Sequence, residues 1–357
     1  MQAISAAIVA SLFALHSSDL QARSLSEPLY VEPFDRGAGS TVLTRASREG
    51  MMYGNPALIS LGSPWIRWFG LQSTMKARGN TPKLTELYNQ NKANFEGDAA
   101  DLVDFADAVD IGVGPEVSFS FLNEYFSVNS FVDLSTYFKY EAFGKVGIPG
   151  SRAILEALGA FSTSLSYAPA RWLSLGLTYS KVGGIYRDLV ITPLNSSEAI
   201  ETFEDLESFG TGDALTGGLL LISRGYTFDY SLGIVAKNIG GLKFSDDTHP
   251  SFPATIDAGL GFAIHTKGSV IDWSLELEDV IQATPYPLSE RLKFGVRFLA
   301  WQHIGLALGY RYRTPTAAIT VDAYLLKLTI GTSTQRVGLG ENSLLRSEYT
   351  LTLTTGY

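Results

Sequence analysis

The sequence of 357 residues has no cysteine and no long apolar stretch. Without cysteine, disulfides, zinc ribbons and thiol nucleophiles are all excluded. The longest compact apolar stretch runs from Ala3 to Leu15, which is shorter than the ~18 residues that a membrane-spanning helix requires, so a polytopic helical membrane protein is excluded. The formal charge of −9, from 27 basic and 36 acidic residues, argues against a nucleic-acid partner because phosphate binding requires a basic surface.

Motifs that carry chemistry are also missing from the sequence. The four histidines show no metal-ligand spacing, and neither a nucleophile elbow nor a glycine loop for phosphate occurs. We therefore expect no enzyme, no catalytic residue, no metal and no cofactor. One catalytic alternative places His265 near Asp257 and Asp272, since some barrel hydrolases use a histidine together with an aspartate or serine.

Alternation with a period of two dominates what is present. Trp273, Leu275 and Leu277 alternate with Asp272, Ser274, Glu276 and Glu278, so one face of this segment is apolar and the other is charged. The chain also contains 35 glycines and 12% aromatic residues, a composition typical of β-barrels. Such segments are expected to be strands that meet a different environment on each face.

Similar segments recur along most of the chain. We expect about 14 strands near residues 64–73, 115–122, 125–140, 160–168, 171–185, 213–223, 226–238, 253–266, 268–279, 290–298, 303–313, 316–323, 325–333 and 345–357. Every second connection between them is a tight turn and most of the others are long, as in transmembrane barrels. The pattern predicts an all-β fold, a transmembrane antiparallel β-barrel in the outer membrane of a diderm bacterium, in contact with membrane lipid.

If the apolar faces meet lipid, the charged residues of four neighbouring strands face the lumen. These residues are Asp257, Asp272, Glu276, Glu278, Lys293, Arg297 and Arg311. The simpler interpretation is a network of cross-strand ion pairs that fills the barrel. The alternative is a polar lining that anchors another segment or in which Arg297 and Arg311 bind the carboxylate of a ligand.

The N-terminus and the long connections give further expectations. Residues 1–24 have the apolar core and small residues of a signal peptide, although no basic residue precedes the core; a packed N-terminal helix is the alternative. Helical spacing occurs at 81–91, 98–109 and 196–208, within the long connections. Phe95, Leu102 and Phe105 are candidate contacts for an apolar ligand at the outer mouth; the alternative is that these helices only pack on each other.

The stretch from Gly37 to Gly62, with the turn Asn55-Pro56-Ala57 just before the first expected strand, resembles the N-terminal hatch of FadL-type outer-membrane transporters for long-chain fatty acids. The segments PATIDAGLGFAI, WSLELEDVIQ and IGLALGYRYRTPTAAITV resemble the C-terminal half of the same broad group. The resemblance implies a hatch over residues 25–63 and a barrel over 64–357. It also implies that the terminal strand, which ends in an aromatic residue, is recognised by the outer-membrane assembly machinery.

Two functions agree with these features. The first is a transporter or porin-like channel for hydrophobic small molecules, with long-chain fatty acids as one candidate. The second is a barrel that transports nothing and serves as a surface scaffold, an adhesin or a secretion partner. The apolar helices expected in the long connections favour the first, and the acidic segment 196–213 suits the second.

Overall fold

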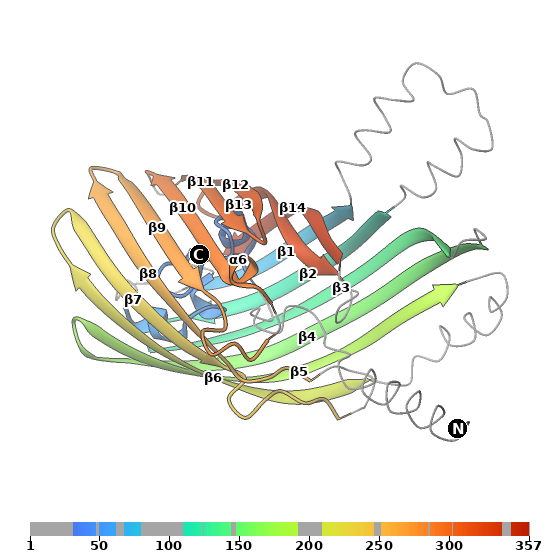
Figure 1. The fold of residues 1–357 in the computed structure, drawn as a ribbon. Coiled ribbons are helices and arrows are strands. Elements are labelled where there is room, and N and C mark those ends of the chain that lie inside the picture. Colours follow the sequence, from blue (N-terminus) through green and yellow to red (C-terminus); the bar gives the residue numbers. More distant parts are fainter. Residues whose placement is uncertain are drawn as a thin grey trace, which may run out of the picture.

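The computed structural model is a closed antiparallel barrel of 14 strands, each paired with its neighbours in the chain and closed by the pairing of β1 with β14 (Figure 1). It describes residues 31–47, 50–61, 68–79, 110–123, 125–143, 148–191, 209–245, 251–284, 286–301, 303–337 and 344–356. The strands are β1 (Trp68–Gly79), β2 (Asp110–Leu122), β3 (Phe126–Phe143), β4 (Ile148–Ala170), β5 (Leu173–Ile191), β6 (Gly210–Arg224), β7 (Phe228–Lys237), β8 (Thr255–Thr266), β9 (Ser269–Leu277), β10 (Leu292–Ala300), β11 (Ile304–Arg311), β12 (Thr314–Asp322), β13 (Leu326–Val337) and β14 (Leu344–Gly356). The helices are α2 (Pro33–Gly37), η1 (Gly50–Met52), η2 (Pro56–Leu61) and α6 (Leu288–Arg291).

The two faces of the wall have opposite chemistry. On β9, the Leu275 side chain is 45% exposed to the outside, whereas the adjacent Ser274 is 1% exposed and faces the lumen. The same alternation of exposed apolar and buried polar residues is found on β1, where Leu71 and Met75 alternate with Thr74 and Lys76. Apolar side chains that face outward all around a closed barrel are suited to lipid, so the predicted transmembrane β-barrel is confirmed. None of the described helices is long and apolar enough to cross a bilayer.

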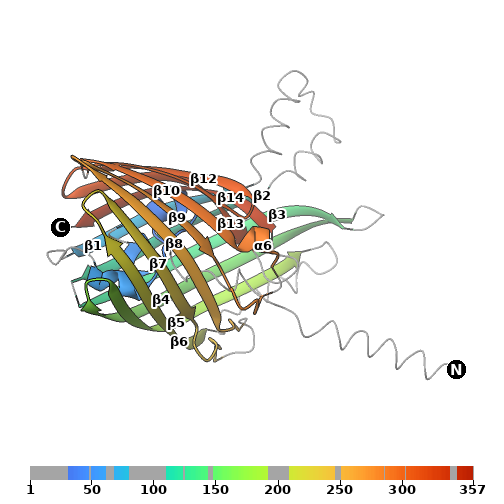
Figure 2. The ribbon, with the colours of Figure 1, turned by 60° about the vertical axis from the view of Figure 1, so that its left-hand side comes forward.

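Six tight turns, which join β2–β3, β4–β5, β6–β7, β8–β9, β10–β11 and β12–β13, lie together at one end of the barrel, which is also the end that β14 reaches (Figure 2). The tight β11–β12 turn lies at the opposite end. Five of the six turns carry an exposed aromatic side chain: Tyr125, Trp172, Tyr226, Trp301 and Tyr324. Aromatic rings collect where the bilayer meets water, and short turns in transmembrane barrels face the periplasm. We therefore assign this end, called the turn end below, to the periplasm.

The wall is taller on one side than on the other (Figure 1). Strands β3, β4 and β5 have 18, 23 and 19 residues, whereas β9 to β12 have 9, 9, 8 and 9. A tilted strand crosses a bilayer with about 9–11 residues. Since the turns are aligned at one end, the surplus of β3–β5 extends beyond the membrane at the other end.

Several strands extend further than expected at the barrel end opposite the turn end. The fourth strand was expected over 160–168 but begins at Ile148. Its first part is paired with β3 and β5 outside the membrane, where apolar and polar side chains need not alternate. Ile154 and Leu155 are adjacent apolar residues there, so the period of two is lost. The first strand extends to Gly79 rather than ending near residue 73, the second begins at Asp110 rather than near residue 115, and the fifth extends to Ile191 rather than ending near residue 185. The expected signal peptide and the helices in the long connections lie outside the described residues.

Candidate functional site

Residues 31–47 and 50–61, called the plug segment below, lie inside the barrel and contact its inner wall strand after strand. The segment begins with α2 against β11, β12 and β13 and ends with η2 against β4, β5 and β6. Between these elements, the backbone N–H groups of Val42 and Leu43 donate to the carboxylate of Glu276 on β9, at 3.1 and 2.7 Å. The plug segment therefore crosses most of the inner circumference.

Glycines on the inner wall allow this close packing. A Cβ atom placed on Gly295 would lie 2.2 Å from the carbonyl oxygen of Ala38, and one on Gly309 would lie 2.1 Å from the backbone nitrogen of Gly39. A Cβ on Gly176 would lie 2.3 Å from the carbonyl carbon of Pro56. The backbones of plug and wall are in direct contact at these positions, which no other residue type permits.

The turn Asn55-Pro56-Ala57 fastens the plug segment to β6. The Asn55 amide donates to the carbonyl oxygens of Leu43 at 2.8 Å and Leu219 at 3.2 Å. Its Oδ1 accepts the backbone N–H of Ala57 at 3.0 Å, and Pro56 then begins η2. Asn55 is completely buried, so these bonds satisfy an amide that would otherwise be costly inside the protein.

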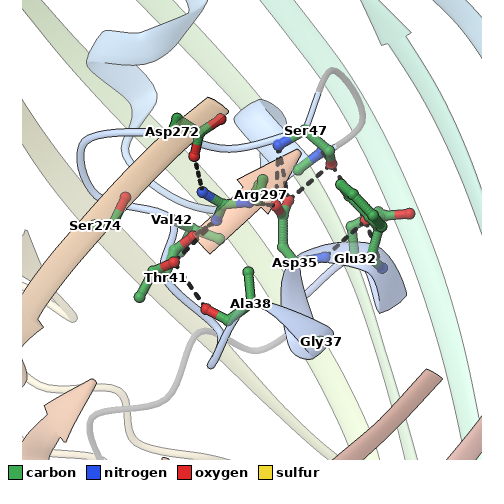
Figure 3. Close-up of polar contacts among 12 residues, drawn as sticks. Glu32, Asp35, Gly37, Ala38, Thr41, Val42, Ser47, Asp272, Ser274 and Arg297 are labelled. Atoms are coloured by element: carbon green, nitrogen blue, oxygen red, sulfur yellow. Dashed lines mark hydrogen bonds and ion pairs between the residues drawn. The ribbon is translucent and has the colours of Figure 1, made fainter. Parts of the chain in front are cut away.

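The lumen charges expected from the sequence are all buried: Asp257, Asp272, Glu276, Glu278, Lys293, Arg297 and Arg311. Arg297 holds the centre of this network, as Figure 3 shows. Its guanidinium donates to Asp35 of α2 at 2.8 Å, to Asp272 at 3.0 Å and to the Thr41 carbonyl oxygen. One cation thus joins two wall strands to the plug segment.

The other charged residues of this lumen network form ion pairs close to Arg297. Lys293 binds Glu278, whose carboxylate also lies 3.6 Å from a guanidinium nitrogen of Arg311. Arg311 donates further to Ser40 of the plug segment at 2.8 Å, and Lys237 binds Asp257. The cations that could have received a ligand carboxylate are therefore engaged by the protein's own carboxylates.

Burial raises the pKa of Asp35 above its ordinary value, while the Arg297 guanidinium and the donors of Ser47 act in the opposite direction. Ser47 supplies its hydroxyl at 2.7 Å and its backbone N–H at 3.0 Å. Asp35 therefore depends on these partners to stay ionised in the interior.

A second charge network was missed in the sequence. Arg36, next to Asp35 in α2, donates to Glu116 of β2 at 2.8 Å and to Glu348 of β14 at 3.0 Å. Lys76 binds Glu116, and Arg78 donates to Glu348 at 2.6 Å. The signal was present, since Lys76 and Arg78 continue the alternation of Thr74, but an expected strand that ended near residue 73 left them in a loop.

The structure does not bring together the catalytic pair considered from the sequence. His265 binds Asp229 through Nε2 at 2.8 Å, whereas Asp257 and Asp272 are paired with Lys237 and Arg297. Among the described residues, no group of three or more potential metal ligands is found. The ligand candidates Phe95, Leu102 and Phe105 lie outside the described residues.

Comparison with known proteins identifies the fold. The sequence has no match among protein-family models or curated proteins. The toluene transporter TodX of Pseudomonas putida is similar in structure, with a TM-score of 0.52 and 11% identity over 92% of this chain and 98% of that chain. The toluene transporter TbuX of Ralstonia pickettii gives a TM-score of 0.53 and 10% identity over 92% and 98%.

These neighbours have the FadL-type architecture that the Asn55-Pro56-Ala57 turn led us to expect, so the resemblance is confirmed at the level of fold. With its apolar outer surface and aromatic turn end, the chain is an outer-membrane barrel.

Proposed function

We propose that the protein is an outer-membrane transporter for small hydrophobic molecules that carry no net charge. The observation that carries this proposal is the plug segment, which crosses the lumen and is bonded to the wall from β4 to β14. A plugged barrel does not act as a wide aqueous pore that admits any small solute. Only molecules that fit between the plug segment and the wall can pass through it. The toluene transporters TodX and TbuX, which share the fold, support this class of substrate.

The charge distribution favours a neutral substrate over a fatty acid. A carboxylate inside the barrel would need a cation, and Arg297 and Arg311 already bind Asp35, Asp272 and Glu278. A ligand carboxylate that bound one of these arginines would have to displace the arginine's own carboxylate partner. That partner would then be a buried charge without compensation, which is costly inside a protein. Long-chain fatty acids remain the second candidate substrate, with Phe95, Leu102 and Phe105 as proposed contacts at the outer mouth.

Uptake by whole cells tests the proposal, because lipopolysaccharide slows the passage of hydrophobic molecules through the outer membrane. Cells with and without the protein would be given radiolabelled toluene, oleate and sucrose. We expect faster uptake of toluene only in cells that carry the protein, and no change for sucrose. Equal toluene uptake would contradict transport and favour the surface scaffold. Faster uptake of oleate alone would contradict the preference for a neutral substrate.

A further inference from the structure

Three consecutive hairpins, β4–β5, β6–β7 and β8–β9, each carry an exposed basic residue at the turn end: Arg171, Arg224 and Lys267. Backbone hydrogen bonds hold their turns side by side. The N–H of Ile222 on β6 donates to the carbonyl oxygen of Trp172 in the β4–β5 turn, at 2.9 Å. The N–H of His265 on β8 donates to the carbonyl oxygen of Thr227 in the β6–β7 turn, at 2.8 Å. These turns therefore form one continuous stretch of the barrel edge, called the basic rim below.

The positive charge of the basic rim is not cancelled on the lipid side. Arg224 faces Asp229 as its register partner on β7, and Asp229 is only 7% exposed and binds His265. In the described part of the chain, Arg171 and Lys267 have no carboxylate partner. None of the described outward-facing residues of β7, β8 and β9 is acidic. A lipid headgroup beside the rim therefore meets a surface of net positive charge.

Four aromatic rings, called the ring cluster below, lie together on the outer face of β7, β8 and β9: Phe228, Tyr230, Phe262 and Trp273. Phe262 is central, with its ring centroid 5.8 Å from that of Phe228 and 5.2 Å from those of the other two. Rings that pack on each other lose little further side-chain entropy when a ligand covers them. Phe262 lies five residues from Lys267, about 17 Å along the strand, which is within the length of a phospholipid acyl chain.

We propose that the basic rim and the ring cluster form a binding site for an anionic phospholipid of the periplasmic leaflet. The phosphate lies next to Lys267 and an acyl chain lies across the ring cluster, while Arg171 adds attraction from the neighbouring part of the rim. Basic residues at a membrane surface attract anionic lipids, and the outward rings belong to the apolar exterior that lipid already covers. Lipid binding at this surface is independent of what the barrel transports.

Native mass spectrometry of the full chain in detergent tests the lipid preference. Equal amounts of dioleoylphosphatidylglycerol, which is anionic, and dioleoylphosphatidylcholine, which is zwitterionic, would be added together. We expect the protein to retain mainly phosphatidylglycerol. Lys267→Gln should weaken the binding of phosphatidylglycerol about fivefold, which is the effect of one basic residue near a membrane surface. The same variant should leave the binding of phosphatidylcholine unchanged.

Lys181→Gln is the matched control, because Lys181 is also an exposed lysine on the outer side of the barrel but lies 3.5 Å from a carboxylate oxygen of Asp213. It should change the binding of neither lipid. Phe262→Leu removes the central ring and should weaken both lipids alike, whereas Phe161→Leu, at an exposed ring on β4, should weaken neither. Equal binding of the two lipids to the unmodified protein, or the same loss in Lys181→Gln as in Lys267→Gln, would overturn the assignment.

Two soluble competitors separate a lipid from other anions. Neither excess poly-glutamate nor excess inorganic phosphate should fully displace phosphatidylglycerol, because neither has an apolar part that lies on the ring cluster. Full displacement by poly-glutamate would identify a surface for an acidic protein, and full displacement by phosphate would identify a site for a small anion. Either result would overturn the lipid site.

Stability in neutral vesicles separates lipid binding from folding. In phosphatidylcholine vesicles, Lys267→Gln should unfold at the same urea concentration as the unmodified protein, because that bilayer offers no anionic headgroup. Unfolding at a lower urea concentration would show that Lys267 acts in folding and would overturn its assignment to the headgroup.

Discussion

At the scale of residues, the account depends on charges buried inside a membrane protein. Arg297 is 1% exposed and its partners Asp35 and Asp272 lie on different elements. The sequence predicted which residues face the lumen, because side-chain direction follows from alternation alone. It did not predict that Asp35 pairs with Arg297, since they are separated by 262 residues and no local pattern relates them.

Replacing Arg297 with Met should strongly destabilise the barrel. The substitution keeps the length of the side chain but leaves Asp35 and Asp272 without their main partner, and breaking a buried ion pair costs about 3–5 kcal/mol. Urea titration in lipid vesicles would measure the change in the free energy of unfolding. Lys267→Met, on the exposed β8–β9 turn, is the control and should leave the free energy unchanged. A loss below about 1 kcal/mol, the range of surface pairs, would show that the network is not coupled to folding.

A charge on the lipid-facing side tests the orientation of β9. Leu275 lies between Leu260 and Phe294 of the neighbouring strands and faces outward. Leu275→Arg should cost about 2–4 kcal/mol if the residue lies near the bilayer midplane. Tyr226→Arg, in a turn at the interface, should cost no more than about 1 kcal/mol in the same titration. Equal costs for the two variants would contradict the placement of the membrane.

At the scale of elements, the plug segment and the wall fit each other through small residues. The adjacent glycines Gly217 and Gly218 of β6 illustrate this fit, because Gly218 faces the lumen and Gly217 faces the outside of the barrel. A Cβ on Gly218 would lie 2.1 Å from Oδ1 of Asn55, whereas a Cβ on Gly217 would meet only Ile239, at 3.5 Å. The inward glycine is therefore part of the contact with the Asn55-Pro56-Ala57 turn.

Gly218→Ala should loosen the plug segment, and Gly217→Ala should not. The added methyl group overlaps Asn55, so the turn must shift and give up its bond to Leu219. Limited proteolysis of the folded barrel would detect the change as faster cleavage within residues 31–61. Identical cleavage patterns for the two variants would mean that this contact does not hold the plug segment.

The strands of the membrane-spanning wall could be predicted from the sequence, and so could most of the extended strand β3, but the start of β4 could not. From β6 to β13, expected and observed strands coincide closely because lipid on one face and polar groups on the other enforce alternation. The start of β4, with Ile154 next to Leu155, lies beyond that constraint. The path of the plug segment was equally inaccessible, because its bonds run largely between backbone groups and distant side chains such as Glu276.

At the scale of the whole molecule, the barrel combines an apolar exterior, an internally neutralised lumen and a plug segment bonded around its wall. Two charged residues side by side in α2 show how this is arranged, since Asp35 binds β10 and Arg36 binds β2 and β14. Moving α2 as a body would break both sets of ion pairs. In the proposed transport, substrate would therefore pass around the plug segment through local side-chain movement, with the plug segment staying in place.

Electrical conductance across planar lipid bilayers tests most directly the central claim that the plug segment closes the barrel to water and leaves selection to hydrophobicity. The unmodified protein should insert without producing steady ion-conducting steps, whereas a variant lacking residues 31–61 should produce large, stable steps typical of an open barrel. Large, stable conductance steps from the unmodified protein would contradict the account.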